Sequence, residues 1–111
     1  MQLSVIIPLF NEEDSLVELN KAIEKVISSM KIEFEIIFVD DGSNDNSWNV
    51  VKELSLNSKN LIGIKFSRNF GKSQALYAGF EAAAGEVIIT MDADLQDCLL
   101  YTSDAADDGL S

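Results

Sequence analysis

The chain has 111 residues, of which 19 are acidic and 8 are basic, so its formal net charge at pH 7 is −11. This balance argues against binding to DNA or RNA, which depends on lysine and arginine neutralising phosphates. The single cysteine and the absence of histidine exclude an internal disulfide bond and the usual zinc sites. Because an acidic protein that handles a phosphate usually needs a cation between them, a metal-dependent site is the first expectation.

The N-terminal part predicts a strand followed by a helix. A short apolar run from Leu3 to Pro8 is typical of a buried strand, which Pro8 ends because it cannot donate to a central ladder. Asn11 is the predicted N-cap of the helix, with Glu12 and the next two acidic residues in its first turn. Apolar residues spaced by three and four extend this helix to about Ser29. They are Leu16, Leu19, Ile23, Val26, Ile27 and Met30.

The middle of the chain repeats this alternation. A second buried strand is predicted from Phe34 to Val39, and it runs directly into Asp40-Asp41. A turn at Gly42-Ser43 leads to a second helix, which ends before a polar loop and a third strand from Leu61 to Phe66. The apolar stripe of this second helix consists of Trp48, Val51 and Leu54.

The last predicted helix follows Gly71 and runs to about Ala84, with Gly85 as its C-terminal stop. Small residues on one side would let its backbone approach the sheet closely; they are Ala75, Gly79 and Ala82. A fourth strand, Val87 to Met91, is predicted to be buried. The alternation of strands and helices predicts an α/β fold with one parallel sheet, right-handed crossovers, strand order 3-2-1-4 and helices on both faces.

Polar side chains follow the predicted strands at one edge of this sheet. Parallel α/β sheets bind ligands at the carboxyl ends of their strands, and we expect five charged residues there: Asp40, Asp41, Arg68, Asp92 and Asp94. In the stretch VIITMDADLQD, Asp92 and Asp94 are two residues apart, and Gln96 adds a neutral oxygen. Such oxygens suit a hard divalent cation. The alternative is a surface turn, in which aspartate is common.

Four motifs in this order and spacing resemble the N-terminal half of family 2 glycosyltransferases of the GT-A fold: SVIIPLFNEE, FVDDGSNDNS, SRNFGKSQALYAGFEAAAG and MDADLQD. The resemblance covers about Leu3 to Asp97 and is strongest to enzymes that transfer a hexose from a nucleotide-diphosphate sugar to a polyprenyl or dolichol phosphate. It implies that residues 1–97 form a truncated, Rossmann-like nucleotide-sugar-binding part. It also implies inversion at the sugar, Mg or Mn as cofactor, and a lipid phosphate as acceptor.

The resemblance also assigns residues to roles. The residues that it implies contact the nucleotide are Pro8, Asn11, Glu12, Asp40, Asp41, Arg68 and Asp92. The metal ligands that it implies are Asp92, Asp94 and Gln96. The residues by themselves leave alternatives open. Asn11 also fits a helix cap, Asp41 fits a turn with the two residues that follow it, and Arg68 fits an ion pair with a neighbouring carboxylate. The catalytic base is not assigned.

The last segment, residues 98–111, reads CLLYTSDAADDGLS and departs from the family pattern, in which a proline pair and an acidic helix follow the metal motif. We expect it to be a non-native or disordered tail without function. Because the acceptor-binding part of the family lies beyond the metal motif, the chain as given is expected to bind donor weakly, to transfer little sugar and to be of low stability.

Two other functional classes fit parts of the pattern. A magnesium-dependent receiver or phosphatase-like domain also gathers aspartates at strand ends, but the first strand here ends in Pro8-Leu9-Phe10 and offers no nucleophile. The other class is a fragment that binds a nucleotide and catalyses nothing. No basic segment followed by a long apolar run opens the chain, so we expect a cytoplasmic location, or the cytoplasmic face of a membrane reached only through parts outside this chain.

Overall fold

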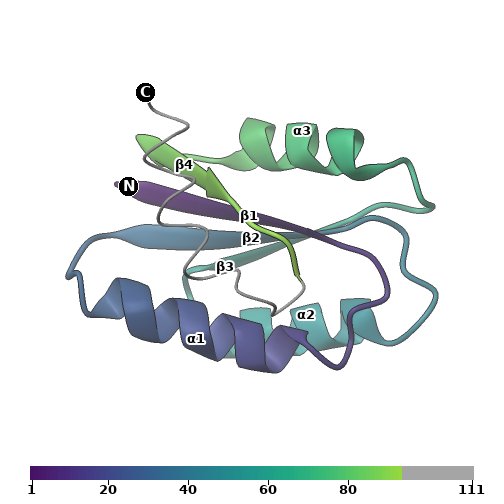
Figure 1. Cartoon of the computed structure of the whole chain (residues 1–111), viewed down its shortest axis with the longest axis horizontal. Helices are drawn as coiled ribbons and strands as arrows, with labels where there is room; N and C mark the ends of the chain where they lie inside the picture. Colours follow the sequence, from purple (N-terminus) through teal and green to yellow (C-terminus); the bar gives the residue numbers. More distant parts are fainter. Residues whose placement is uncertain (94–111) are drawn as a thin grey trace.

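The computed structural model describes residues 1–93 and contains a four-stranded parallel sheet in the order β3-β2-β1-β4 (Figure 1). The strands are β1 (Leu3–Leu9), β2 (Phe34–Asp40), β3 (Leu61–Lys65) and β4 (Val87–Thr90). The helices are α1 (Leu16–Ser28), α2 (Ser47–Asn57) and α3 (Lys72–Ala82). The predicted α/β class and strand order are therefore confirmed. The predictions for Asp94, Gln96 and residues 98–111 lie outside the described residues.

Helices cover both faces of the sheet: α1 and α2 lie on one face, and α3 lies on the other (Figure 1). Every residue of the adjacent strands β1 and β2 is buried, because both lie between neighbouring strands and between the helical layers. Alternate residues serve the two layers, as the two-residue period of a strand requires. Val5, Ile7 and Phe38 belong to the core with α1 and α2, whereas Ile6 and Ile37 pack with Ala75 of α3.

The predicted end of β1 at Pro8 is wrong by one residue, because the strand continues to Leu9. Pro8 ends the hydrogen-bond ladder between β1 and β4 but not the ladder between β1 and β2. On the β2 side, the Leu9 carbonyl accepts a hydrogen bond from the Asp41 N–H at 2.9 Å. On the β4 side, the last bond runs from the Met91 N–H to the Ile6 carbonyl at 3.0 Å. Pro8 is the next residue of β1 to face β4, and it has no N–H to donate. β1 and β4 are therefore free to separate at their carboxyl ends.

The predicted N-cap at Asn11 is wrong. Helix α1 begins four residues later than expected, after Ser15, so the acidic residues that were predicted in its first turn precede it. Asn11 instead has a left-handed backbone with φ 54°, a conformation that asparagine tolerates better than most residues. Near the other end of α1, Val26 is 47% exposed because it lies off the buried stripe, which runs through Ile23 and Ile27. Met30 is 58% exposed and lies beyond the end of α1 at Ser28.

The end of α3 and the burial of β4 also differ from the predictions. α3 ends at Ala82, which is exposed, whereas Ala75 and Gly79 are buried as expected. Gly85 is not the helix stop; it lies against Ser4, where a Cβ atom would come within 2.6 Å of the Ser4 nitrogen. β4 was predicted to be buried, but Val87 and Ile88 are 41% and 40% exposed. Among the described strands β4 has only β1 as a neighbour. No helix within residues 1–93 is long and apolar enough to cross a membrane.

Candidate functional site

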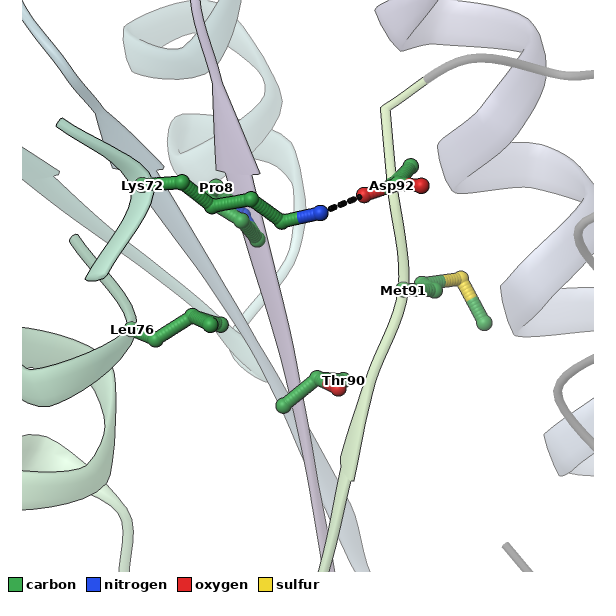
Figure 2. A pocket seen from close by; sticks show the side chains of 6 residues that line it. All are labelled: Pro8, Lys72, Leu76, Thr90, Met91 and Asp92. Carbon is green, nitrogen blue, oxygen red and sulfur yellow. Dashed lines mark hydrogen bonds and ion pairs between the residues drawn. The ribbon is translucent and has the colours of Figure 1, made fainter. Parts of the chain in front are cut away.

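The carboxyl edge of the sheet carries two adjoining hollows, each with a volume of about 180 Å³. They share three lining residues: Pro8, Lys72 and Asp92. The first is completed by Leu76, Thr90 and Met91 and lies between the start of α3 and the end of β4 (Figure 2). The second is completed by Leu9, Phe10 and Asp41. The hollows thus occupy the place where Pro8 interrupts the pairing of β1 with β4.

An ion pair links the two sides of these hollows. Lys72, the first residue of α3, extends its side chain past Pro8 toward Asp92, which follows β4 (Figure 2). The distance from Lys72 Nζ to Asp92 Oδ1 is 2.6 Å, and the two side chains are 62% and 65% exposed. Sequence reasoning did not single out Lys72. The sequence feature that could have identified Lys72 is a basic residue at the predicted start of a helix, at the carboxyl edge of the sheet, in a chain with few basic residues.

Asp41 lines one hollow and also fastens the loop that precedes α3. Asp41 is 5% exposed. Oδ1 accepts a hydrogen bond from the Phe70 N–H at 2.8 Å, and Oδ2 accepts from the Gly71 N–H at 3.1 Å and from Asn69 Nδ2 at 3.3 Å. The alternative interpretation, in which Asp41 forms a local turn with the two residues that follow it, is not observed. This carboxylate sets the position of the loop that carries Lys72.

Asp40 makes the local turn that the sequence suggested for its neighbour. Its Oδ1 accepts a hydrogen bond from the Ser43 N–H at 2.8 Å, and the residue is 1% exposed. Its Oδ2 is buried without a hydrogen-bond partner among the described residues. Asp40 lines neither hollow. The structure therefore places Asp41 at the candidate site, whereas Asp40 is buried outside it.

Asn11 and Glu12 join the loop after β1 to the loop before α2. The Asn11 side-chain oxygen accepts hydrogen bonds from the N–H groups of Asn44 and Asp45 at 2.8 Å and 3.3 Å. The Glu12 N–H donates to Ser47 Oγ at 2.9 Å. Asn11 and Glu12 line neither hollow, whereas Pro8 lines both. Of these three predicted pocket residues, the structure brings Pro8 to the hollows and uses the other two to connect loops.

Asp45 is the carboxylate at the centre of this loop connection. Its Oδ1 accepts from the Ser47 hydroxyl at 2.6 Å and from the Ser47 N–H at 2.9 Å, and its Oδ2 accepts from the Glu13 N–H at 3.4 Å. Desolvation raises the pKa of the Asp45 carboxyl, but the hydrogen bonds from Ser47 and Glu13 together hold that pKa below its ordinary value. The loop connection is therefore strongest when Asp45 is ionised.

Arg68 lies beside the loop that Asp41 fastens, but it lines neither hollow. Its guanidinium carbon lies 4.7 Å from the centre of the Phe70 ring, a cation–π arrangement. Within residues 1–93 it makes no ion pair, so the alternative of a neighbouring carboxylate is not seen. Its predicted contact with a donor phosphate stays a prediction.

The predicted metal site is described only in part. Asp92 is placed at the mouth of the hollows, whereas Asp94 and Gln96 lie outside the described residues. Within residues 1–93 no three acidic or cysteine side chains gather closely enough to hold a metal ion. Oδ1 of Asp92 lies 2.6 Å from Lys72 Nζ, so this carboxylate is paired with a cationic group of the protein. Its oxygens are of the kind that Mg²⁺ and Mn²⁺ prefer.

Curated relatives share most of this chain. It is 44% identical over 94 residues to the undecaprenyl-phosphate 4-deoxy-4-formamido-L-arabinose transferase of Pseudomonas fluorescens, covering 84% of this chain and 28% of the relative. It is 37% identical over 97 residues to a prophage bactoprenol glucosyl transferase homolog of Escherichia coli, covering 87% and 32%. The chain thus spans less than a third of the length of these relatives.

Solved structures and a family profile agree with these relatives. A mannosyltransferase from Pyrobaculum calidifontis in complex with GDP-Man and Mn²⁺ superposes with a TM-score of 0.72 at 27% identity, covering 84% of this chain and 27% of that one. Staphylococcus aureus TarS in complex with UDP-GlcNAc gives 0.70 at 26%, covering 97% and 32%. The profile of glycosyl transferase family 2 matches residues 4–97. By this match and by its fold, the chain belongs to glycosyl transferase family 2.

Proposed function

We propose that residues 1–97 form the donor-binding part of an inverting glycosyltransferase. This enzyme transfers a hexose or a related sugar from a nucleotide-diphosphate sugar to a polyprenyl phosphate. The observation that carries the proposal is the meeting of Asp41, Lys72 and Asp92 around adjoining hollows at the carboxyl edge of a parallel sheet. This edge is where α/β sheets of this kind hold nucleotides.

The donor's diphosphate needs positive charge at an edge that is rich in carboxylates. We assign this charge to Mg²⁺ or Mn²⁺ held by Asp92, Asp94 and Gln96. When bound, such a cation stabilises the negative charge that develops on the departing nucleoside diphosphate. The complex of the Pyrobaculum calidifontis mannosyltransferase with GDP-Man and Mn²⁺ supports this assignment.

The nucleoside is proposed to contact Pro8 and Asp41. A carboxylate only accepts hydrogen bonds, so it suits the ring N–H of uracil or guanine and the ribose hydroxyls. Asp41 already accepts three hydrogen bonds from the loop at residues 69–71. The preformed position of this carboxylate supports the proposal, because an acceptor fixed before binding loses little freedom when the nucleotide arrives.

The acceptor is proposed to be a lipid phosphate, which places the complete enzyme at the cytoplasmic face of a membrane. The names of the relatives, which refer to undecaprenyl phosphate and bactoprenol, support this choice. A lipid phosphate is already ionised at neutral pH, so this acceptor needs positioning more than deprotonation.

Calorimetric titration with UDP, GDP and their sugar conjugates tests the proposal. We expect binding in the presence of Mn²⁺, loss of binding with EDTA, and a loss of at least about tenfold for Asp94→Ala, because an uncompensated carboxylate edge repels a diphosphate. Glu53→Ala is the matched control, since Glu53 is exposed on α2. Equal affinity with Mn²⁺, with EDTA and for Asp94→Ala would overturn the metal assignment. Donor binding with little transfer to polyprenyl phosphate is the result expected of this chain, because the acceptor-binding part of the family lies beyond the metal motif.

A further inference from the structure

The ion pair between Lys72 and Asp92 crosses the opening at which the proposed donor and cation would enter. Lys72 Nζ lies 2.6 Å from Asp92 Oδ1, and both residues line both hollows (Figure 2). Asp92 is also the carboxylate that we assign to the metal site. One oxygen atom of the site is therefore already occupied by a positive charge that belongs to the protein.

A divalent cation bound at Asp92 would displace this ammonium group. Two positive charges beside one carboxylate oxygen repel each other strongly at such short range. The displacement is easy, because the pair is 62% and 65% exposed and exposed ion pairs contribute little free energy. The lysine side chain is a flexible four-carbon stem with a compact charge, so it can change partner without movement of α3.

The displaced ammonium group stays beside the hollows because its backbone is fixed. Lys72 is the first residue of α3, and the preceding Gly71 is held by a hydrogen bond from its N–H to Asp41 Oδ2 at 3.1 Å. In the hollow that Asp92 and Lys72 share with Asp41, the Asp41 oxygens already accept three hydrogen bonds, so a bound diphosphate would be the better partner for this charge.

We propose that Lys72 is an exchangeable counter-cation of the donor site. Without ligand it neutralises Asp92, and on arrival of the divalent cation it leaves Asp92 and pairs with the diphosphate of the donor. This inference rests on the proposed function, because it requires a cation at Asp92 and a diphosphate in the hollow. In this scheme Lys72 competes with the metal ion when the metal binds alone. When metal and nucleotide bind together, Lys72 strengthens the binding of the nucleotide.

Removal of the lysine charge therefore has opposite effects on the two ligands. In Lys72→Met, the affinity for Mn²⁺ alone should increase by about two- to fivefold, the range of an exposed ion pair. The affinity for UDP or GDP at saturating Mn²⁺ should decrease by about three- to tenfold, because a charged hydrogen bond to phosphate is lost. Lys72→Arg keeps the charge and should stay close to the wild-type protein in both measurements.

The experiment uses the complete 111-residue chain, with Mn²⁺ binding followed by electron paramagnetic resonance and nucleotide binding by calorimetry at low ionic strength. Lys21→Met is the matched control, because Lys21 is an exposed residue of α1 and its loss changes the net charge equally. In an Asp92→Asn background, Lys72→Met should no longer raise the affinity for Mn²⁺, which shows that the two residues act on each other.

The outcomes separate this inference from the proposed function. Opposite changes for the two ligands in Lys72→Met, absent in the control, support the exchange. If the wild-type chain binds Mn²⁺ and nucleotide but Lys72→Met lowers both affinities or changes neither, the exchange is overturned and the proposed function stands. A wild-type chain with no Mn²⁺-dependent nucleotide binding overturns both.

Discussion

Replacement of Gly42 by alanine is expected to damage the fold at the point where the loops of the site meet. Gly42 follows Asp41 and has a backbone φ of 78°, which lies in the left-handed region. A Cβ atom there would lie 2.3 Å from the carbonyl carbon of Arg68 and 2.5 Å from the nitrogen of Asn69. Both of these are backbone atoms, so no side-chain rotation can relieve the overlap.

The expected loss of stability has two parts. The left-handed backbone costs about 1–2 kcal/mol for a residue with a Cβ atom, and overpacking against fixed atoms adds roughly 1–3 kcal/mol. Gly42→Ala should therefore lower the free energy of unfolding by about 2–5 kcal/mol, a large share of the roughly 5–15 kcal/mol that stabilises a typical domain. For a domain of this size the melting temperature should fall by about 8 °C or more.

Urea unfolding monitored by the fluorescence of Trp48, the single tryptophan of the chain, measures this loss. Gly71→Ala is the control, because Gly71 also has a positive φ, 104°, but a Cβ atom added there meets nothing within 4 Å. We expect the larger loss for Gly42→Ala. A loss below about 1 kcal/mol, or one no larger than that of Gly71→Ala, would show that the loops do not pack as closely as the structure indicates.

Two further predictions concern the polar contacts that hold the loops and the sheet. Because the folded-state pKa of Asp45 is lowered, its hydrogen bonds with Ser47 contribute stability above the ordinary carboxyl pKa and lose it as the pH falls through the lower folded-state value. Asp45→Ala should thus cost about 1 kcal/mol at pH 7 and less as the pH falls below about 4, as measured by urea midpoints across pH; a pH-independent difference would refute this. Glu35→Ala removes the acceptor of the Ala84 N–H at 2.7 Å and should lower the free energy of unfolding by about 1–3 kcal/mol. Glu33→Ala is the control, because Glu33 is exposed and its loss should change that free energy by less than about 0.5 kcal/mol. Similar urea midpoints for both variants would contradict this prediction.

The sequence by itself determined the class of fold and the edge of the sheet that carries the site. Its apolar runs are short and separated by stretches with helical spacing, and this local periodicity is set by backbone geometry before any tertiary contact forms. The approximate limits of β2 and β3 agree with the structure for this reason. Asp41 and Asp92 were expected at the carboxyl edge, and both line the hollows there.

Only the tertiary structure decided which polar groups bond to one another, because hydrogen bonds between loops depend on distances that no local pattern encodes. Asn11 has the sequence context of a helix cap, yet it bonds to residues 33 and 34 positions later. Asp41 fastens the loop before α3 rather than its own turn, and Lys72 meets Asp92 across a separation of 20 residues. Each pairing brings together the ends of different strands, which adjoin only once the parallel sheet has formed.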